Sequence, residues 1–208
     1  MIRIFLFNWH EKYKRDFPWR HTKDPYKIMI AEFMLHRTKA EQITQIYSDF
    51  LEEYPNIDSL AIAKHSQIEK VTEHLGLHWR TKHFIKSANF IKKEFNGTYP
   101  KDKNQLMKIP GVGDYTASVI LTVCFNKSVP VIDSNISRFI NRYYNLGLKG
   151  EIRRKKQIFE KAIILFNMDN PKDFLFAILD FTALVCTPIK PKCKDCVINK
   201  KCKYPIEK

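Results

Sequence analysis

The stretch that decides the fold is Leu106-Met107-Lys108-Ile109-Pro110-Gly111-Val112-Gly113-Asp114-Tyr115-Thr116-Ala117. We predict that one helix ends at the Pro-Gly-x-Gly turn and that a second helix begins directly after it. Glycine adopts backbone dihedral angles that other residues resist, and Gly111 and Gly113 expose amide groups at a helix N-terminus. Such amides can hold a phosphate without reading base sequence. Alone, however, Gly-x-Gly is more often an ordinary turn between helices.

Apolar residues on both sides of this stretch recur with the spacing of amphipathic helices. Helices are predicted over residues 43–54, before Pro55, over residues 81–95, before Gly97, and over residues 171–185. No stretch alternates with period two for long enough to predict a strand. The sequence therefore predicts an all-α protein.

The chain is strongly basic. Its 208 residues include 36 Lys and Arg against 22 Asp and Glu, which gives a net charge of +14, and the pI is near 9.5. This charge indicates a polyanionic partner, with nucleic acid first, although a merely lysine-rich surface is the simpler alternative. No apolar run reaches the roughly 18 residues that span a bilayer, and no targeting segment is visible. We expect a cytoplasmic protein without a membrane partner.

Four cysteines near the C-terminus give the strongest local signal: Cys186, Cys193, Cys196 and Cys202, with the spacing C-x6-C-x2-C-x5-C. The segment is rich in lysine and proline and has too few apolar residues to fold by itself. A metal centre bound by four thiolates would supply the missing cross-link, and both zinc and a [4Fe–4S] cluster suit that chemistry. Zinc ribbons usually present two C-x2-C pairs, and here there is one. A fifth cysteine, Cys124, is most simply a buried core thiol.

Two carboxylates stand out from their surroundings. Asp133 follows an apolar stretch and precedes a predicted helix, so its ordinary interpretation is an N-cap. A capping carboxylate that is held rigidly is also suited to electrostatic catalysis. Glu32 lies in the apolar run 28–35, where it must either point outward or line a pocket, because a buried unpaired charge is costly. By itself, Glu32 is most simply an exposed helix residue.

These features occur together and in one order, and that combination resembles the endonuclease III and MutY branch of the helix-hairpin-helix (HhH-GPD) DNA glycosylases. Residues 17–20, 24–26 and 32–38 match the N-terminal region of MutY-like enzymes, and residues 109–113 match the hairpin. Asp133 falls at the position of the family's catalytic aspartate. The four cysteines match the family's [4Fe–4S] pattern.

The resemblance implies two helical lobes around a DNA-binding cleft. Residues 21–125 would form a lobe that carries the helix-hairpin-helix motif at about 106–120. Residues 1–20 and 126–208 would form the second lobe, with one [4Fe–4S] cluster per chain in the loop 186–202. The expected ligand of this monomer is double-stranded DNA containing a mismatch, from which the target nucleotide flips into a pocket.

Departures from the family pattern refine the expected activity. Lyase members keep a lysine where this chain has Tyr115, so the resemblance implies a monofunctional enzyme that uses water as its nucleophile. The chain ends soon after Cys202, so the domain with which MutY recognises the opposite guanine is expected to be absent. The combination is similar to the thymine-DNA mismatch glycosylases, which remove thymine or uracil opposite guanine. An abasic-site endonuclease is then the expected downstream partner.

The resemblance also assigns roles to individual residues. Asp133 would stabilise the positive charge that develops on the sugar and position or deprotonate the water. Glu32 would line the pocket, and Tyr115 would stack on the flipped pyrimidine. The implied DNA contacts are Gly111, Val112 and Gly113 in the hairpin, and His36, Arg37 and Leu77 at the vacated stack or the opposite base. Asp114 is unexpected, because relatives often carry a basic residue there.

Three alternatives remain at this point. An adenine-DNA glycosylase without its recognition domain is favoured by Glu32, which MutY also has. A catalytically silent iron–sulfur DNA-binding module is disfavoured by Asp133. A redox iron–sulfur protein is disfavoured by the basic charge and the hairpin.

Overall fold

The computed structural model describes residues 2–36, 38–75 and 81–204, and every regular element in these ranges is a helix, which confirms the all-α prediction. None of these helices is long and apolar enough to cross a bilayer. The chain divides into two compact units. The continuous unit is Asp16–Phe125, and the composite unit joins Met1–Arg15 to Asn126–Lys208.

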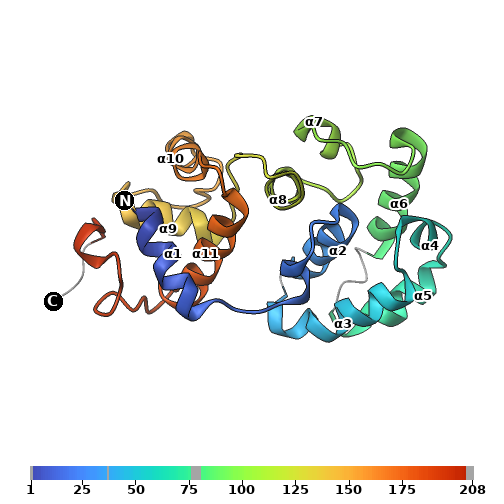
Figure 1. The fold of residues 1–208 in the computed structure, drawn as a ribbon, viewed down its shortest axis with the longest axis horizontal. Helices are drawn as coiled ribbons and strands as arrows, with labels where there is room; N and C mark the ends of the chain where they lie inside the picture. The colour runs from blue at the N-terminus through green and yellow to red at the C-terminus, as the bar shows by residue number, and fades with distance from the viewer. Residues whose placement is uncertain (1, 37, 76–80, 205–208) are drawn as a thin grey trace. The chain divides into compact units, whose positions relative to one another are not determined.

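The continuous unit is built around the apolar helix α2. Its elements are η1 (Pro18–His21), α2 (Pro25–Leu35), α3 (Ala40–Glu53), α4 (Ile57–Ala61), α5 (His65–Thr72), η2 (Glu73–Leu75), α6 (Thr81–Phe95), α7 (Lys103–Leu106) and α8 (Asp114–Phe125). Helix α2 packs against α3 and α8, and Met29, Ile30 and Met34 are fully buried. Helix α6 packs against α4 and α5 (Figure 1).

The composite unit brings the first helix of the chain against the last long one. Its elements are α1 (Ile2–Tyr13), α9 (Ser134–Tyr144), α10 (Lys156–Phe166), α11 (Pro171–Leu184) and η3 (Asn199–Lys201). Helix α1 packs along α11, which also contacts α9 and α10 (Figure 1). The core contains Phe139, Phe166, Phe174 and Phe181, each at most 1% exposed.

A buried ion pair joins the end of α1 to α11. Asp180 is fully buried, and its Oδ1 accepts a hydrogen bond from Arg15 Nε at 2.6 Å. The Arg15 amide donates to Asp180 Oδ2 at 3.0 Å, and His10 Nε2 lies 3.1 Å from the same oxygen. A buried carboxylate needs such partners, because an unpaired one would cost several kcal/mol of stability.

Helix boundaries follow the sequence signals closely. Helix α3 ends at Glu53, before Pro55, and α6 begins at Thr81 and stops ahead of Gly97, whose φ is +77°. Residues 16–20, which the family pattern placed with the second lobe, belong to the continuous unit. The reason is packing, because Trp19 is buried and its ring lies edge-on to Tyr47 of α3 at 5.4 Å.

Candidate active site and cysteine cavity

The hairpin between α7 and α8 is tight and uses its two glycines differently. The first helix is a single turn, Lys103–Leu106, and the chain then turns through residues 107–113 into α8. Gly111 has φ +86°, and a Cβ there would meet His83 Cβ at 3.0 Å and Phe33 Cζ at 3.1 Å. Gly113 is exposed, has no such backbone requirement, and a Cβ there would meet nothing within 4 Å. Only Gly111 therefore adopts the backbone conformation for which the sequence predicted a glycine. Gly113 has no side chain to cover the backbone at the start of α8.

Asp114, the unexpected acid at this turn, has a cationic partner. Lys103 Nζ of α7 lies 2.8 Å from Asp114 Oδ1. The ion pair ties the two helices of the hairpin together and neutralises the carboxylate beside the exposed backbone. Asp114 therefore repels a phosphate at this turn less than an unpaired carboxylate would.

Asp133 caps α9, as its position predicted. Its Oδ1 accepts a hydrogen bond from the Ile136 amide at 2.6 Å, and its Oδ2 accepts one from Asn135 Nδ2 at 3.1 Å. The side chain is only partly exposed. Burial raises the pKa of Asp133, while the hydrogen bonds from Ile136 and Asn135 and the charge of Arg138 act in the opposite direction. The site holds a carboxylate rigidly in a medium of low polarity, where its charge acts strongly.

A hydrogen-bond chain connects Asp133 to the cysteine loop. Asn135 donates to Asp133, and Asn135 Oδ1 accepts from Arg138 Nη1 at 2.8 Å. The Arg138 guanidinium also donates from Nη2 to the carbonyl oxygens of Thr182 at 3.0 Å and Cys186 at 2.9 Å. The position of Asp133 therefore depends on a residue that begins the cysteine loop.

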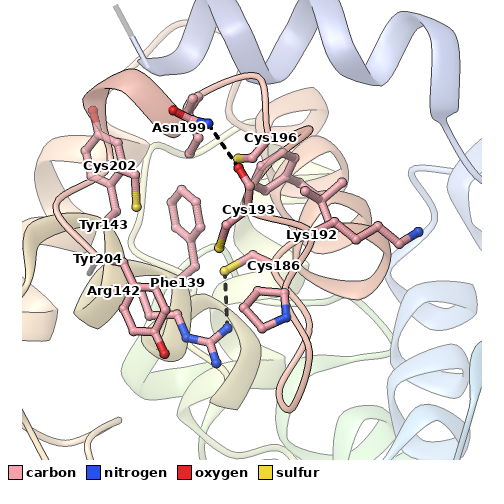
Figure 2. Close-up of a pocket in the computed structure, with 14 residues that line it drawn as sticks. Phe139, Arg142, Tyr143, Cys186, Lys192, Cys193, Cys196, Asn199, Cys202 and Tyr204 are labelled. Carbon is pink, nitrogen blue, oxygen red and sulfur yellow. Dashed lines mark hydrogen bonds between the residues drawn. The ribbon is translucent and has the colours of Figure 1, made fainter. Parts of the chain in front are cut away.

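The four C-terminal cysteines line one cavity (Figure 2). Cys186 follows α11, while Cys193, Cys196 and Cys202 lie on the loop that folds back through η3. Phe139 and Ile198 line the same cavity and give it an apolar wall. Although the side chains share a cavity, the described residues form no group of three ligands already arranged for a metal ion.

The donor set suits a thiolate-bound metal centre. Burial raises the pKa of the Cys196 thiol to about 11, and the nearby Cys202, Cys186 and Cys193 add to that effect. Four thiols that line one cavity would ionise together only with a cation between them. Arg142 supports the loop, because its Nη1 lies 3.6 Å from Cys186 Sγ and 2.6 Å from the Thr187 carbonyl oxygen. The residues therefore fit a [4Fe–4S] cluster, and zinc suits the same donors. Cys124 lies apart, half-buried in the last turn of α8 rather than fully buried.

The other predicted site residues belong to the continuous unit. Glu32 lies on α2 and is half-buried rather than exposed. Tyr115 lies in the first turn of α8, which packs against α2, and is also half-buried. His36 is exposed directly after α2. Arg37 and Leu77 fall outside the residues that the structure describes.

Three residues of these networks were missed by the sequence analysis: Asn135, Arg138 and Lys103. Asn135 and Arg138 are three positions apart on α9, so they share a face of that helix. This spacing, directly after Asp133, is the sequence feature from which the hydrogen-bond network could have been predicted. No sequence feature predicts the ion pair between Lys103 and Asp114, because the two residues meet across a turn whose shape the sequence does not determine.

A family model covers most of this architecture. Residues 30–163 match the HhH-GPD superfamily base excision DNA repair protein. The chain belongs to this family, which confirms the predicted resemblance.

Within this family, the chain is similar to thymine- and thymine/uracil-DNA glycosylases. The chain is 35% identical to a thymine-DNA glycosylase of Aeropyrum pernix, covering 98% of this chain and 93% of the relative. It is 34% identical to a thymine/uracil-DNA glycosylase of Methanothermobacter thermautotrophicus, covering 92% and 87% of the two chains. A solved structure of a thermostable thymine-DNA glycosylase superposes with a TM-score of 0.91 at 31% identity, covering 98% of this chain and 94% of that one.

Proposed function

We propose that the chain is a monofunctional DNA glycosylase that removes thymine or uracil mismatched with guanine. The observation that carries the proposal is similarity to thymine- and thymine/uracil-DNA glycosylases along nearly the whole length of both chains. Tyr115 supports the monofunctional part, because a phenol cannot form the imine that strand cleavage by a lysine requires. The product is an abasic site, which a separate endonuclease would cut.

Asp133 would act on the sugar. Breaking the N-glycosidic bond leaves positive charge on the deoxyribose, and a fixed carboxylate stabilises that charge without reorganising. Hydrogen bonds from the Ile136 amide and from Asn135 to the two carboxylate oxygens hold Asp133 in one rotamer. Because the side chain is half-buried, the electric field of its charge is weakly screened by water. The same carboxylate would orient or deprotonate the attacking water.

The continuous unit would supply the base pocket and the DNA grip. Glu32 and Tyr115 lie half-buried on helices α2 and α8, which pack against each other. Glu32 would hydrogen-bond the base or water, and Tyr115 would stack on a pyrimidine. The turn Gly111–Gly113, in which both glycines are exposed, would bind a phosphate through backbone amides at the start of α8. His36, with Arg37 and Leu77, would fill the vacated stack or contact the opposite base.

The four cysteines would hold one [4Fe–4S] cluster, whose contribution is cross-linking rather than catalysis. Cys186 is held by Arg138 and Arg142, so the cluster would fix the far end of the network that positions Asp133. Iron and sulfide analysis of protein purified without oxygen tests this assignment. We expect about four irons per chain. One zinc per chain in a colourless protein would contradict it.

The activity is tested with duplexes that contain T·G, U·G, A·G or A·8-oxoguanine, each incubated with and without alkali. We expect T·G and U·G strands to be cut only after alkali, and borohydride to trap no enzyme on DNA. Release of adenine alone would instead identify the adenine-specific alternative. Covalent trapping would show that another lysine acts as nucleophile.

A further inference from the structure

The loop between α9 and α10 concentrates positive charge that the proposed function does not use. Its cations are Lys149, Arg153, Arg154 and Lys155, with Lys156 next at the start of α10, and its single acid is Glu151. All six side chains are exposed.

The backbone of this loop has a defined shape. Asn145, Gly147 and Gly150 have positive φ angles of 52°, 65° and 71°. The side-chain amide of Asn141 donates to the Leu148 carbonyl oxygen at 3.0 Å and accepts from the Leu148 amide at 3.1 Å. The loop is thereby fastened to α9, so its cations extend from a folded turn rather than from a tail.

The charge of the loop also acts on Asp133, which caps the start of α9. The pKa of Arg153 is raised first by its hydrogen bonds with Glu151, and the negative charge of Asp133 also contributes. Arg153 and Asp133 belong to the same compact unit, so the positive charge of the loop and the carboxylate influence one another.

Glu151 forms an ion pair with only one of these cations, Arg153. Arg153 donates to Glu151 from its amide, from Nε at 2.9 Å and from Nη2 at 2.6 Å. These bonds lower the pKa of Glu151 to about 2, so the carboxylate stays ionised. Lys149, Arg154 and Lys155 have no carboxylate within ion-pair distance in the part of the chain that the structure describes.

We propose that the folded basic loop 149–155 binds the phosphodiester backbone of the DNA on which the enzyme acts. The inference rests on the proposed function. An ionised Asp133 repels the phosphates that flank a flipped nucleotide, and the loop cations offset this repulsion while attracting the strand. Glu151 limits the attraction by holding Arg153, so that it acts as a built-in competitor of the phosphate.

The test compares two double variants that lose the same charge. Arg154→Ala/Lys155→Ala removes two loop cations, and Lys12→Ala/Lys14→Ala removes two exposed cations at and just after the end of α1 as the matched control. Affinity for a fluorescein-labelled T·G duplex is measured by anisotropy between about 50 and 200 mM salt. Single-turnover base release at saturating enzyme is measured in parallel.

For the loop variant we expect affinity to fall by about tenfold or more and the slope of log K against log salt to flatten by about two, since each phosphate contact contributes roughly 0.9. Its saturated base-release rate should stay within about twofold of wild type. The α1 control should keep the wild-type slope. Equal slopes in the loop and α1 variants would overturn the inference.

Glu151→Gln tests the same surface in the opposite direction. Release of Arg153 should raise affinity about threefold at low salt and steepen the slope by up to one phosphate contact. Unchanged or weaker binding would contradict the role given to Glu151. If wild type releases neither thymine nor uracil but the loop variants lose DNA binding, the proposed function fails while phosphate binding by the loop stands.

Discussion

Helices α8 and α9 follow one another in the chain, and they begin in opposite ways. The start of α9 is closed by its own side chain, because Asp133 takes the Ile136 amide and is itself held by Asn135. The start of α8 follows exposed Gly113, which has no side chain, and the nearby carboxylate of Asp114 is bound by Lys103. Both helix ends carry the partial positive charge of the helix dipole.

The difference teaches how one structural feature serves two purposes. At α9 the amides are used to hold a carboxylate, so that end presents negative charge to a ligand. At α8 the open backbone leaves the positive end of the helix available to an anion. The start of α9 therefore suits a developing sugar cation, and the start of α8 suits a phosphate.

The largest effect is expected at the closed helix start. Asp133→Asn keeps the size and the cap but removes the charge, so base release should fall by about 10²-fold or more in single-turnover assays. Melting temperature should stay close to wild type, and duplex affinity should not fall, because the change removes only a negative charge. If turnover barely changes, Asp133 is only a cap.

Asn135→Ala should have an intermediate effect that depends on pH. The Asn135 hydrogen bond lowers the pKa of Asp133, so its loss should raise that pKa further. Because catalysis needs the ionised carboxylate, activity falls as pH drops through this pKa, and the acid limb should move to higher pH. Ser134→Ala, at an exposed neighbour, is the control. A lower rate with an unmoved acid limb would indicate a purely structural role for Asn135.

The two glycines of the open helix start should separate stability from binding. Gly111→Ala should cost about 1–3 kcal/mol, because it adds a side chain at positive φ against Phe33 and His83. That cost corresponds to several degrees in melting temperature. Gly113→Ala should change stability by less than about 0.5 kcal/mol and weaken duplex binding several-fold. Equal melting temperatures for the two variants would contradict the steric difference.

The smallest effect is expected at Asp114. Asp114→Asn removes a negative charge beside the open backbone and releases Lys103, so duplex affinity should rise about twofold at low salt. The gain should vanish in high salt, because exposed charges are screened. Weaker binding by this variant would mean that the Lys103–Asp114 pair shapes the hairpin rather than merely neutralising the acid.

The sequence was informative where a feature depends on neighbours along the chain. The helix spans, the cap at Asp133 and the hairpin position all follow from local spacing, and the cysteine spacing indicated a shared site. The contacts of Arg138 did not follow, because its partner Cys186 lies 48 positions away and meets it only in the folded unit. Likewise, nothing local distinguishes Gly111 from Gly113, since the distinction comes from Phe33 and His83 across the core.

The buried carboxylate of Asp180 has a consequence for biosynthesis. Its partners His10 and Arg15 leave the ribosome 170 and 165 residues earlier. The continuous unit Asp16–Phe125 is complete long before α11 emerges. Helix α1 must therefore wait with its apolar face uncovered until α11 has been translated. Nascent chains of this protein should accordingly depend on a chaperone for the N-terminal segment, and not for the unit that follows it.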